Sequence, residues 1–219
     1  MPDPTGLLRA PRRETTAPKI EVYADISCPF AYVGLRRLLA ERDARGSRTE
    51  LRIRAWPLEW VNDRPHDADV AAAAIAALRG SVAPHLFTGF DPATYPRTTI
   101  AALGLVDVAY RAGAGVGEGV SMYVCDAVFE HGRPIADDVV LQAIGREVGI
   151  DVPEPALADA LVRADWERGR ARHVQGSPHF FLGDRGWFCP SLRIRHDEAG
   201  FDVSVDTTAL AEFLAVAFA

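Results

Sequence analysis

A cysteine at position 28 stands where a predicted strand is followed by a predicted helix. Apolar and polar residues alternate from Lys19 to Ala24, which is typical of a strand, and leucines and arginines dominate the segment from Val33 to Glu41, which is typical of a helix. A thiol at a helix N-terminus lies near unpaired N–H groups and the positive end of the helix dipole, which favours the thiolate. Cys28 is therefore a candidate nucleophile. The alternative, a cysteine packed as a small apolar side chain, fits the local sequence equally well.

A second candidate segment runs from Gly176 to Phe181 and opens a late strand with a Ser177-Pro178 peptide bond. Bonds before proline adopt the cis form far more readily than other peptide bonds, although the sequence alone is weak evidence for it. His179 follows directly. It could move a proton if it faced a cleft, and a structural position on the strand is the alternative.

The elements that must position these residues form two α/β units separated by helices. A β-α-β unit is predicted from Lys19 to Pro57, and its helical crossover favours a parallel strand pair. From His66 to His173 the strand pattern disappears and apolar residues recur at helical spacing. Helix start signals within that segment are Asp67 or Asp69, Thr98 or Thr99, Asp137 or Asp138, and Pro155.

The C-terminal part predicts a hairpin and a closing helix. Strands are expected on either side of a turn at Gly183 to Gly186, followed by a short extension between residues 192 and 203. Thr207 or Thr208 is expected to cap the last helix. The glycine-rich segment from Gly113 to Gly119 is predicted to be a loop and not a dinucleotide-binding motif, because it follows a helix.

Composition and charge exclude several classes of function. A formal net charge of -6 argues against general nucleic-acid binding, and no apolar run is long enough to cross a bilayer. The histidines show no metal-ligand spacing, so no metal is expected. Residues 1–18 are predicted to be a flexible arm without a secretory signal. Together with three cysteines, an odd number, this favours a cytoplasmic chain with individually assigned thiols.

The predicted order of elements resembles the thioredoxin fold as the DsbA family elaborates it. Cys28-Pro29-Phe30-Ala31 lies where that family has Cys-Pro-x-Cys, and Gly176 to Phe181 resembles the loop whose cis-proline faces the cysteine. The segment from Phe129 to Asp151 resembles the insertion helices of the FrnE-like branch, the kappa-class glutathione transferases and the 2-hydroxychromene-2-carboxylate isomerases. The resemblance implies an α/β thioredoxin fold, with a thioredoxin-like domain over residues 19–65 and 174–219 and a helical insertion domain over residues 66–173.

Ala31 departs from the pattern of the dithiol members. A second cysteine at this position resolves their mixed disulfides, which a methyl group cannot do. The kappa and isomerase branch has serine at the position of Cys28 and uses it to hold the thiolate of bound glutathione. The resemblance therefore implies a monothiol site with a low-molecular-weight thiol, glutathione or mycothiol, as cosubstrate.

Further residues are candidates for binding that thiol or its reaction partner. The backbone of Ser177, before a cis-Pro178, would pair in strand fashion with the peptide part of the thiol. Ser191 is a candidate for its carboxylate, with an ordinary turn serine as the alternative. Phe30, Tyr32 and Trp60 could line an apolar pocket, with ordinary core packing as the alternative.

Cys189 offers a different route to disulfide chemistry. It could pair with Cys28 if the hairpin brings it to the same face, but a disulfide needs Cα atoms about 4.4–6.8 Å apart, which no sequence pattern supplies. A buried, inert position is the alternative. Cys125 lies on an apolar helical stripe and is expected in the core.

These observations predict a thiol-dependent oxidoreductase or transferase that acts on a small, largely apolar electrophile or disulfide. The sequence does not separate redox turnover, transfer and isomerisation, and it leaves a homodimer open. The alternative is a non-catalytic ligand- or protein-binding module on a degenerate thioredoxin scaffold, which the alanine at position 31 would fit. The joint presence of Cys28-Pro29 and Ser177-Pro178 weighs against that alternative.

Overall fold

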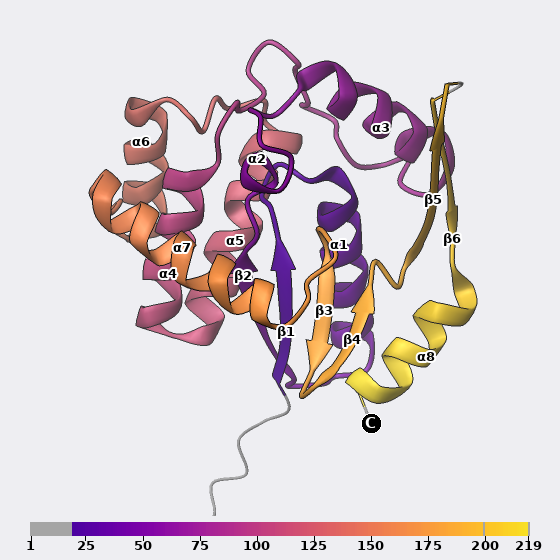
Figure 1. Ribbon diagram of the computed structural model, residues 1–219. Coiled ribbons are helices and arrows are strands. Elements are labelled where there is room, and N and C mark those ends of the chain that lie inside the picture. The colour runs from indigo at the N-terminus through magenta and orange to yellow at the C-terminus, as the bar shows by residue number, and fades with distance from the viewer. Residues whose placement is uncertain (1–18, 199, 219) are drawn as a thin grey trace, which may run out of the picture.

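A mixed β-sheet forms the centre of the molecule in the computed structural model, which describes residues 19–198 and 200–218 (Figure 1). Within these residues four strands pair in the order β2-β1-β3-β4. The pair β1 and β2 is parallel, as predicted, and the pairs β1 with β3 and β3 with β4 are antiparallel. The strands are β1 (Lys19–Ala24), β2 (Glu50–Ala55), β3 (His179–Leu182) and β4 (Arg185–Phe188). The arm predicted over residues 1–18 lies outside the described residues.

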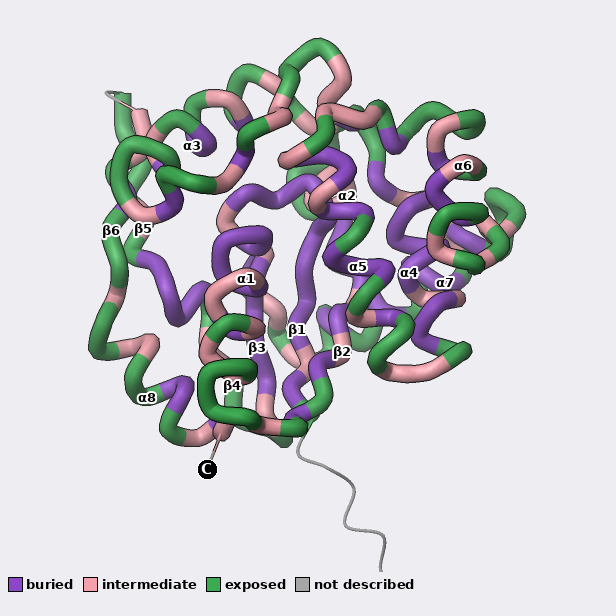
Figure 2. The backbone as a smooth tube through the Cα atoms, turned by 180° about the vertical axis from the view of Figure 1, so that it is seen from behind, coloured by how far each residue is buried: buried purple, intermediate pink, exposed green. Residues whose placement is uncertain are grey.

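Two helices pack on one face of this sheet, which we call the α1 face. Alternation along β1 turns Ile20 and Val22 toward α1 (Pro29–Ala44), whose Leu35 and Leu38 are buried. Figure 2 shows α1 in front of β1 and β3, which are buried along most of their length. The closing helix α8 (Thr207–Ala217) adds Phe213, whose ring lies 5.2 Å from that of Phe180.

The cap of α8 differs from the prediction. The Oδ1 atom of Asp206 accepts a hydrogen bond from Ala209 N at 3.0 Å, so Asp206 and neither threonine is the N-cap. Asp and Thr are both good N-cap residues, and the sequence could not rank neighbouring candidates.

The opposite face of the sheet, which we call the α7 face, is covered by α7 (Pro155–Ala171) (Figure 1). Tyr23, Trp56 and Phe181 form a small buried aromatic cluster there. The ring of Trp166 on α7 packs against that of Trp56, with ring centroids 4.3 Å apart. Arg54 lies beneath the helix and forms ion pairs with Glu21 and Asp165.

The chain between β2 and β3 is helical and, within the described residues, contains no strand, as predicted. Asp67 and Asp137 cap their helices and Pro155 opens α7. The division into domains at residues 65–66 and 173–174 stays a prediction, because these helices and the α1 face share one continuous apolar core. The helices are α2 (Leu58–Val61), α3 (Ala68–Ser81), α4 (Ile100–Ala112), α5 (Ala114–Phe129), α6 (Asp138–Val148) and α7.

The glycine-rich segment is helical, so the loop prediction over Gly113 to Gly119 is wrong. Helix α5 begins at Ala114, directly after Gly113. A Cβ atom at Gly117 would overlap the ring of Tyr110 on α4, so the glycine permits the close crossing of two helices. That ring is fixed in turn, because the Tyr110 hydroxyl accepts from Ile53 N at 2.9 Å on the edge of β2.

The C-terminal hairpins also differ from the prediction. The turn between β3 and β4 comprises only Gly183 and Asp184, so β4 begins two residues earlier than expected. Gly183 has a φ of 58°, which suits the tight turn. Strands β5 (Leu192–Asp197) and β6 (Gly200–Val205) form a separate antiparallel pair that extends to α3 (Figure 1). In the described ranges no helix is long and apolar enough to span a membrane.

Candidate active site

Cys28 lies at the junction of β1 and α1 and is the N-cap residue of α1. Its Sγ accepts a hydrogen bond from Ala31 N at 3.4 Å and donates one to the backbone oxygen of Ser177 at 3.2 Å. Pro29 occupies the first helical position, where its missing N–H costs nothing. The thiol therefore contacts both motifs that the sequence singled out, from positions 149 residues apart.

The turn before Cys28 is held by a buried carboxylate that the sequence analysis did not identify. Oδ1 of Asp25 accepts from the N and the Oγ of Ser27, both at 2.8 Å. Its Oδ2 accepts from Leu58 N at 2.6 Å, and its own N–H donates to Ser177 Oγ at 2.9 Å. Asp25 thus joins the end of β1, the start of α2 and the Ser177 loop. The available signal was an acidic residue at a strand-to-helix turn, three residues before the cysteine.

Two side chains complete this polar cluster, His66 from the segment between α2 and α3 and Tyr95 from the segment between α3 and α4. Nε2 of His66 lies 3.5 Å from Asp25 Oδ2, and its ring nitrogens lie 3.3 Å from Ser27 Oγ. The Tyr95 hydroxyl donates to the backbone oxygen of Ser27 at 2.6 Å. No local sequence signal marks His66 for this cluster, and the described residues contain no group of three or more side chains that could hold a metal.

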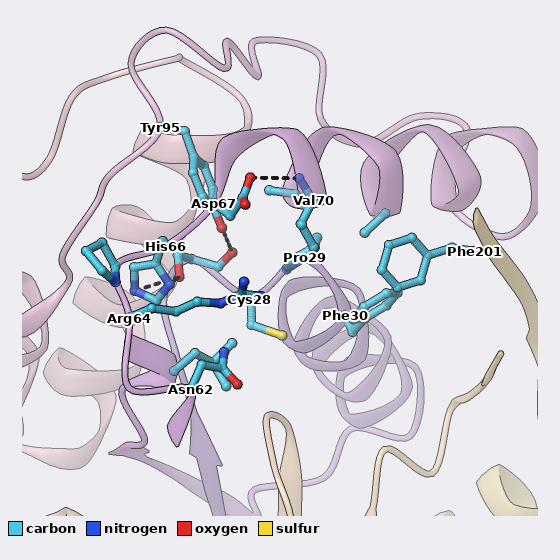
Figure 3. Close-up of a pocket in the computed structure, with 15 residues that line it drawn as sticks. Cys28, Pro29, Phe30, Asn62, Arg64, His66, Asp67, Val70, Tyr95 and Phe201 are labelled. Carbon is cyan, nitrogen blue, oxygen red and sulfur yellow. Dashed lines mark hydrogen bonds between the residues drawn. The ribbon is translucent and has the colours of Figure 1, made fainter. Parts of the chain in front are cut away.

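A cavity of about 130 Å³ opens beside Cys28 (Figure 3). One side is polar, with Asn62, Arg64 and His66, and the other is apolar, where the rings of Phe30 and Phe201 lie 5.6 Å apart. Arg64 brings a positively charged side chain to the lining of the cavity. The lining residues are Ser27, Cys28, Pro29, Phe30, Leu58, Asn62, Arg64, Pro65, His66, Asp67, Val70, Ala71, Ala74, Tyr95 and Phe201.

The electrostatics of Cys28 differ from the expectation for a helix terminus. Burial raises the pKa of the thiol to about 11, and the charge of Asp25 acts in the same direction. Hydrogen bonds with Ser177 and Ala31 oppose this change and do not cancel it. In this conformation desolvation outweighs the helix terminus, and the neutral thiol is favoured.

Of the predicted binding residues, Pro29 and Phe30 line this cavity and the other eight do not. The Tyr32 hydroxyl lies 2.7 Å from Asp126 Oδ1 on α5 and points away from the thiol. Trp60 packs against Trp166 with ring centroids 5.9 Å apart. Phe30, in contrast, lines the cavity directly.

In the second motif, Ser177 lies at the Cys28 thiol, whereas His179 faces the α7 side of the sheet. The Ser177-Pro178 peptide bond is cis, and Ser177 contacts the thiol. His179 is turned to the α7 face, where its ring lies 4.4 Å from that of Phe181 and its Nδ1 accepts from Gln175 N at 3.1 Å. Burial, assisted by the charge of Arg172, lowers the pKa of His179 to about 4 and keeps it neutral near pH 7.

The remaining predicted residues lie next to the Ser177-Pro178 loop. Cys189 is buried, and its N–H donates to the backbone oxygen of Pro178 at 3.0 Å. Ser191 is also buried. Its Oγ has no hydrogen-bond partner among the described residues, while Arg37 binds its backbone oxygen at 3.0 Å. Cys125 is buried in α5, as expected, and all three thiols are free.

Comparison with protein families places this arrangement in a known group. The model of the DSBA-like thioredoxin domain matches residues 19–194. A comparison with curated protein sequences finds no significant match. The family match confirms the predicted thioredoxin fold with a helical insertion.

Solved structures share the fold at low sequence identity. A cytosolic disulfide reductase, DsbM from Pseudomonas aeruginosa with GSH, is 18% identical, with a TM-score of 0.57 over 77% of this chain and 88% of that chain. A probable DsbA oxidoreductase from Streptomyces coelicolor is 21% identical, with a TM-score of 0.57 over 78% of this chain and 82% of that chain. A 2-hydroxychromene-2-carboxylate isomerase is 16% identical, with a TM-score of 0.54 over 78% of this chain and 88% of that chain.

Proposed function

The chain belongs to the family of DsbA-like thioredoxin domains, and from this premise we propose that it is a thiol-dependent oxidoreductase or transferase with Cys28 as its nucleophile. Its substrate is a small, largely apolar electrophile or disulfide, and its cosubstrate is a low-molecular-weight thiol, glutathione or mycothiol. The position of the Cys28 thiol carries the proposal. Among the residues described, it is the only side chain that belongs to the Cys-Pro motif, contacts the Ser177 loop and also lines the cavity.

The geometry around Sγ supports nucleophilic chemistry once the proton is lost. The Ala31 N–H already points at the sulfur, and a thiolate there would be stabilised by this donor and by the positive end of the α1 dipole. The thiolate would attack one sulfur of a small disulfide. A Cys28 mixed disulfide forms, the original S–S bond breaks, and the second sulfur leaves as a thiolate.

The cavity supports a small ligand with both charged and apolar parts. Arg64 and Asn62, which line the cavity, can bind a carboxylate of the thiol. The backbone of Ser177, which contacts Cys28 Sγ, is the proposed partner for the peptide portion of a thiol bound at that sulfur. Phe30, Val70 and Phe201 offer an apolar wall for the electrophile. The solved DsbM structure contains GSH, which supports a thiol of this class as the ligand.

The test follows the state of Cys28 after exposure to oxidised glutathione or oxidised mycothiol. The protein is alkylated under native conditions, and the alkylated cysteines are identified by peptide mass spectrometry. In the wild-type chain we expect at least one of these disulfides to block Cys28 from alkylation, and a reductant to reverse the block. Cys125→Ser, which removes a buried thiol that does not line the cavity, serves as the matched control and should behave like wild type.

The opposite outcome identifies the non-catalytic alternative. If Cys28 stays fully alkylatable after both treatments, the mixed-disulfide chemistry is contradicted and a binding module is favoured. If Cys125→Ser abolishes the block while Cys28→Ser leaves an equal amount of blocked thiol, the nucleophile has been misassigned.

A further inference from the structure

Cys28 needs a second sulfur to complete disulfide exchange, and the helix does not provide one. The residue at the usual resolving position is Ala31, which offers only its backbone N–H to Sγ. Without a resolving thiol a mixed disulfide persists until an external thiol attacks it. The remaining cysteines of the chain, Cys125 and Cys189, are therefore the internal candidates.

Strand register places Cys189 beside the loop that binds Cys28. The pairing of His179 with Phe188 continues one position further, where Cys189 N donates to the Pro178 oxygen at 3.0 Å. Cys28 Sγ donates to the preceding backbone oxygen, that of Ser177. The two cysteines therefore contact consecutive peptide groups of one short loop.

Both cysteines also belong to the same side of the sheet. Cys28 and Cys189 lie in the apolar core of the α1 face, not in the aromatic cluster of the α7 face. The neighbouring Pro178 packs toward α1, with its Cγ 3.5 Å from where a Cβ of Gly34 would stand. No sheet layer separates the two thiols.

The backbone of Cys189 is unusual for its residue type. Its φ is 44°, in the left-handed region that residues other than glycine seldom adopt. Cys189 thus holds a backbone conformation that suits glycine, directly after β4 and beside the Pro178 loop.

We propose that Cys189 is the resolving thiol of Cys28, so that this chain forms a Cys28–Cys189 disulfide in place of the usual Cys-x-x-Cys bond. A small disulfide such as oxidised glutathione first forms a mixed disulfide with Cys28 and releases one thiolate. The Cys189 thiolate then attacks Cys28 Sγ, forms the internal disulfide and releases the second thiolate. The protein loses two electrons and two protons, and the small disulfide becomes two thiols.

Burial raises the pKa of Cys189 to about 12. The Leu192 N–H and the Arg37 guanidinium oppose this change and would stabilise the thiolate that attacks Cys28.

This inference rests on the proposed function, and the experiment separates the two. Wild type, Cys189→Ser and Cys189→Gly are exposed to oxidised glutathione, then alkylated and examined by intact mass and non-reducing peptide mapping. Glycine suits the positive φ, so Cys189→Gly removes the sulfur without straining the backbone. Cys125→Ser is the control for loss of a buried thiol.

We expect the wild type and Cys125→Ser to lose two hydrogens, to retain no glutathione and to yield a linked Cys28–Cys189 peptide pair. Both Cys189 variants should instead retain one glutathione on Cys28, with a lifetime at least about tenfold longer than in wild type. A wild type that retains the adduct as long as the Cys189 variants do overturns the resolving role and leaves the proposed function intact. A Cys28 that reacts in neither the wild type nor the variants overturns both.

Discussion

The two faces of the central sheet bury polar groups in different arrangements. On the α1 face they gather at one end, where Asp25 binds the N–H groups of Ser27 and Leu58 beside Cys28. On the α7 face they form an ion-pair network in which Arg54 joins Glu21 on β1 to Asp165 on α7. The first arrangement fixes a turn that carries a thiol, and the second attaches a helix to the sheet. Stability and thiol chemistry should therefore respond to different substitutions.

The largest effect is expected on the α7 face, from Asp165→Ala. Asp165 is buried and binds both Arg54 and the N–H of Ala55. The substitution leaves Arg54 with Glu21 as its remaining ion-pair partner and the Ala55 N–H without an acceptor, so the free energy of unfolding should fall by about 3 kcal/mol in urea denaturation. The alkylation rate of Cys28 should not change.

Asp159→Ala on the same helix is the matched control. Its pair with Arg163 is exposed and should contribute less than about 1 kcal/mol. A faster alkylation of Cys28 in Asp165→Ala under fully folded conditions would show that the two faces are coupled.

On the α1 face, Asp25→Asn should change both stability and reactivity. One amide oxygen replaces two carboxylate oxygens, so at least one buried donor loses its partner and stability should fall by about 1–3 kcal/mol. Because the charge of Asp25 raises the pKa of Cys28, its removal should lower that pKa. The pH dependence of Cys28 alkylation should therefore shift to lower pH.

Asp67→Asn is the control for Asp25→Asn, because it removes a carboxylate that lines the cavity. Asp67 caps α3 and is exposed, so its loss of charge should cost less than about 1 kcal/mol. Equal shifts of the alkylation profile in both variants would contradict a specific role for Asp25.

Alanine substitutions at two helical glycines, Gly169 on α7 and Gly34 on α1, test how tightly each face of the sheet is packed. A Cβ at Gly169 on α7 would lie 2.6 Å from the Trp56 ring, so Gly169→Ala should destabilise the protein by about 1–3 kcal/mol. At Gly34 on α1 the nearest atom would be 3.5 Å away, which is ordinary contact. Gly34→Ala should therefore stabilise the protein by about 0.5–1 kcal/mol through helix propensity. Thermal unfolding of both variants checks the comparison, and a reversed order would contradict it.

A further expected effect is a pH dependence that arises from His179. Its pKa in the folded chain is about 4, below the ordinary 6.5, so between these values only the unfolded chain takes up the proton. Stability should decline as pH falls from 6.5 toward 4, by about 1–2 kcal/mol once solvent screening is allowed for. His179→Gln should lose this part of the decline. Identical slopes of stability against pH in the variant and the wild type would show that His179 is not the group responsible.

The sequence identified the fold and both motifs of the site because each depends on local pattern. Alternation marked β1, caps and prolines marked the helices, and Cys28 and Ser177-Pro178 lay at predicted boundaries. The glycine-rich segment was misread, since only the crossing of α4 and α5 requires Gly117 to lack a side chain. His66, Tyr95 and Phe201 were missed as site residues, because nothing in their local sequence records which residue they will approach.

By itself the sequence determined that a cysteine stands at a helix N-terminus without a resolver at Ala31, since a strand, a cap and a first-turn proline are properties of consecutive residues. Tertiary structure alone decided the state of that cysteine. Burial beneath the insertion raises its pKa, and strand register places Cys189 against the loop that Cys28 contacts. Desolvation and through-space contact depend on segments far apart in the chain, which only the folded molecule brings together.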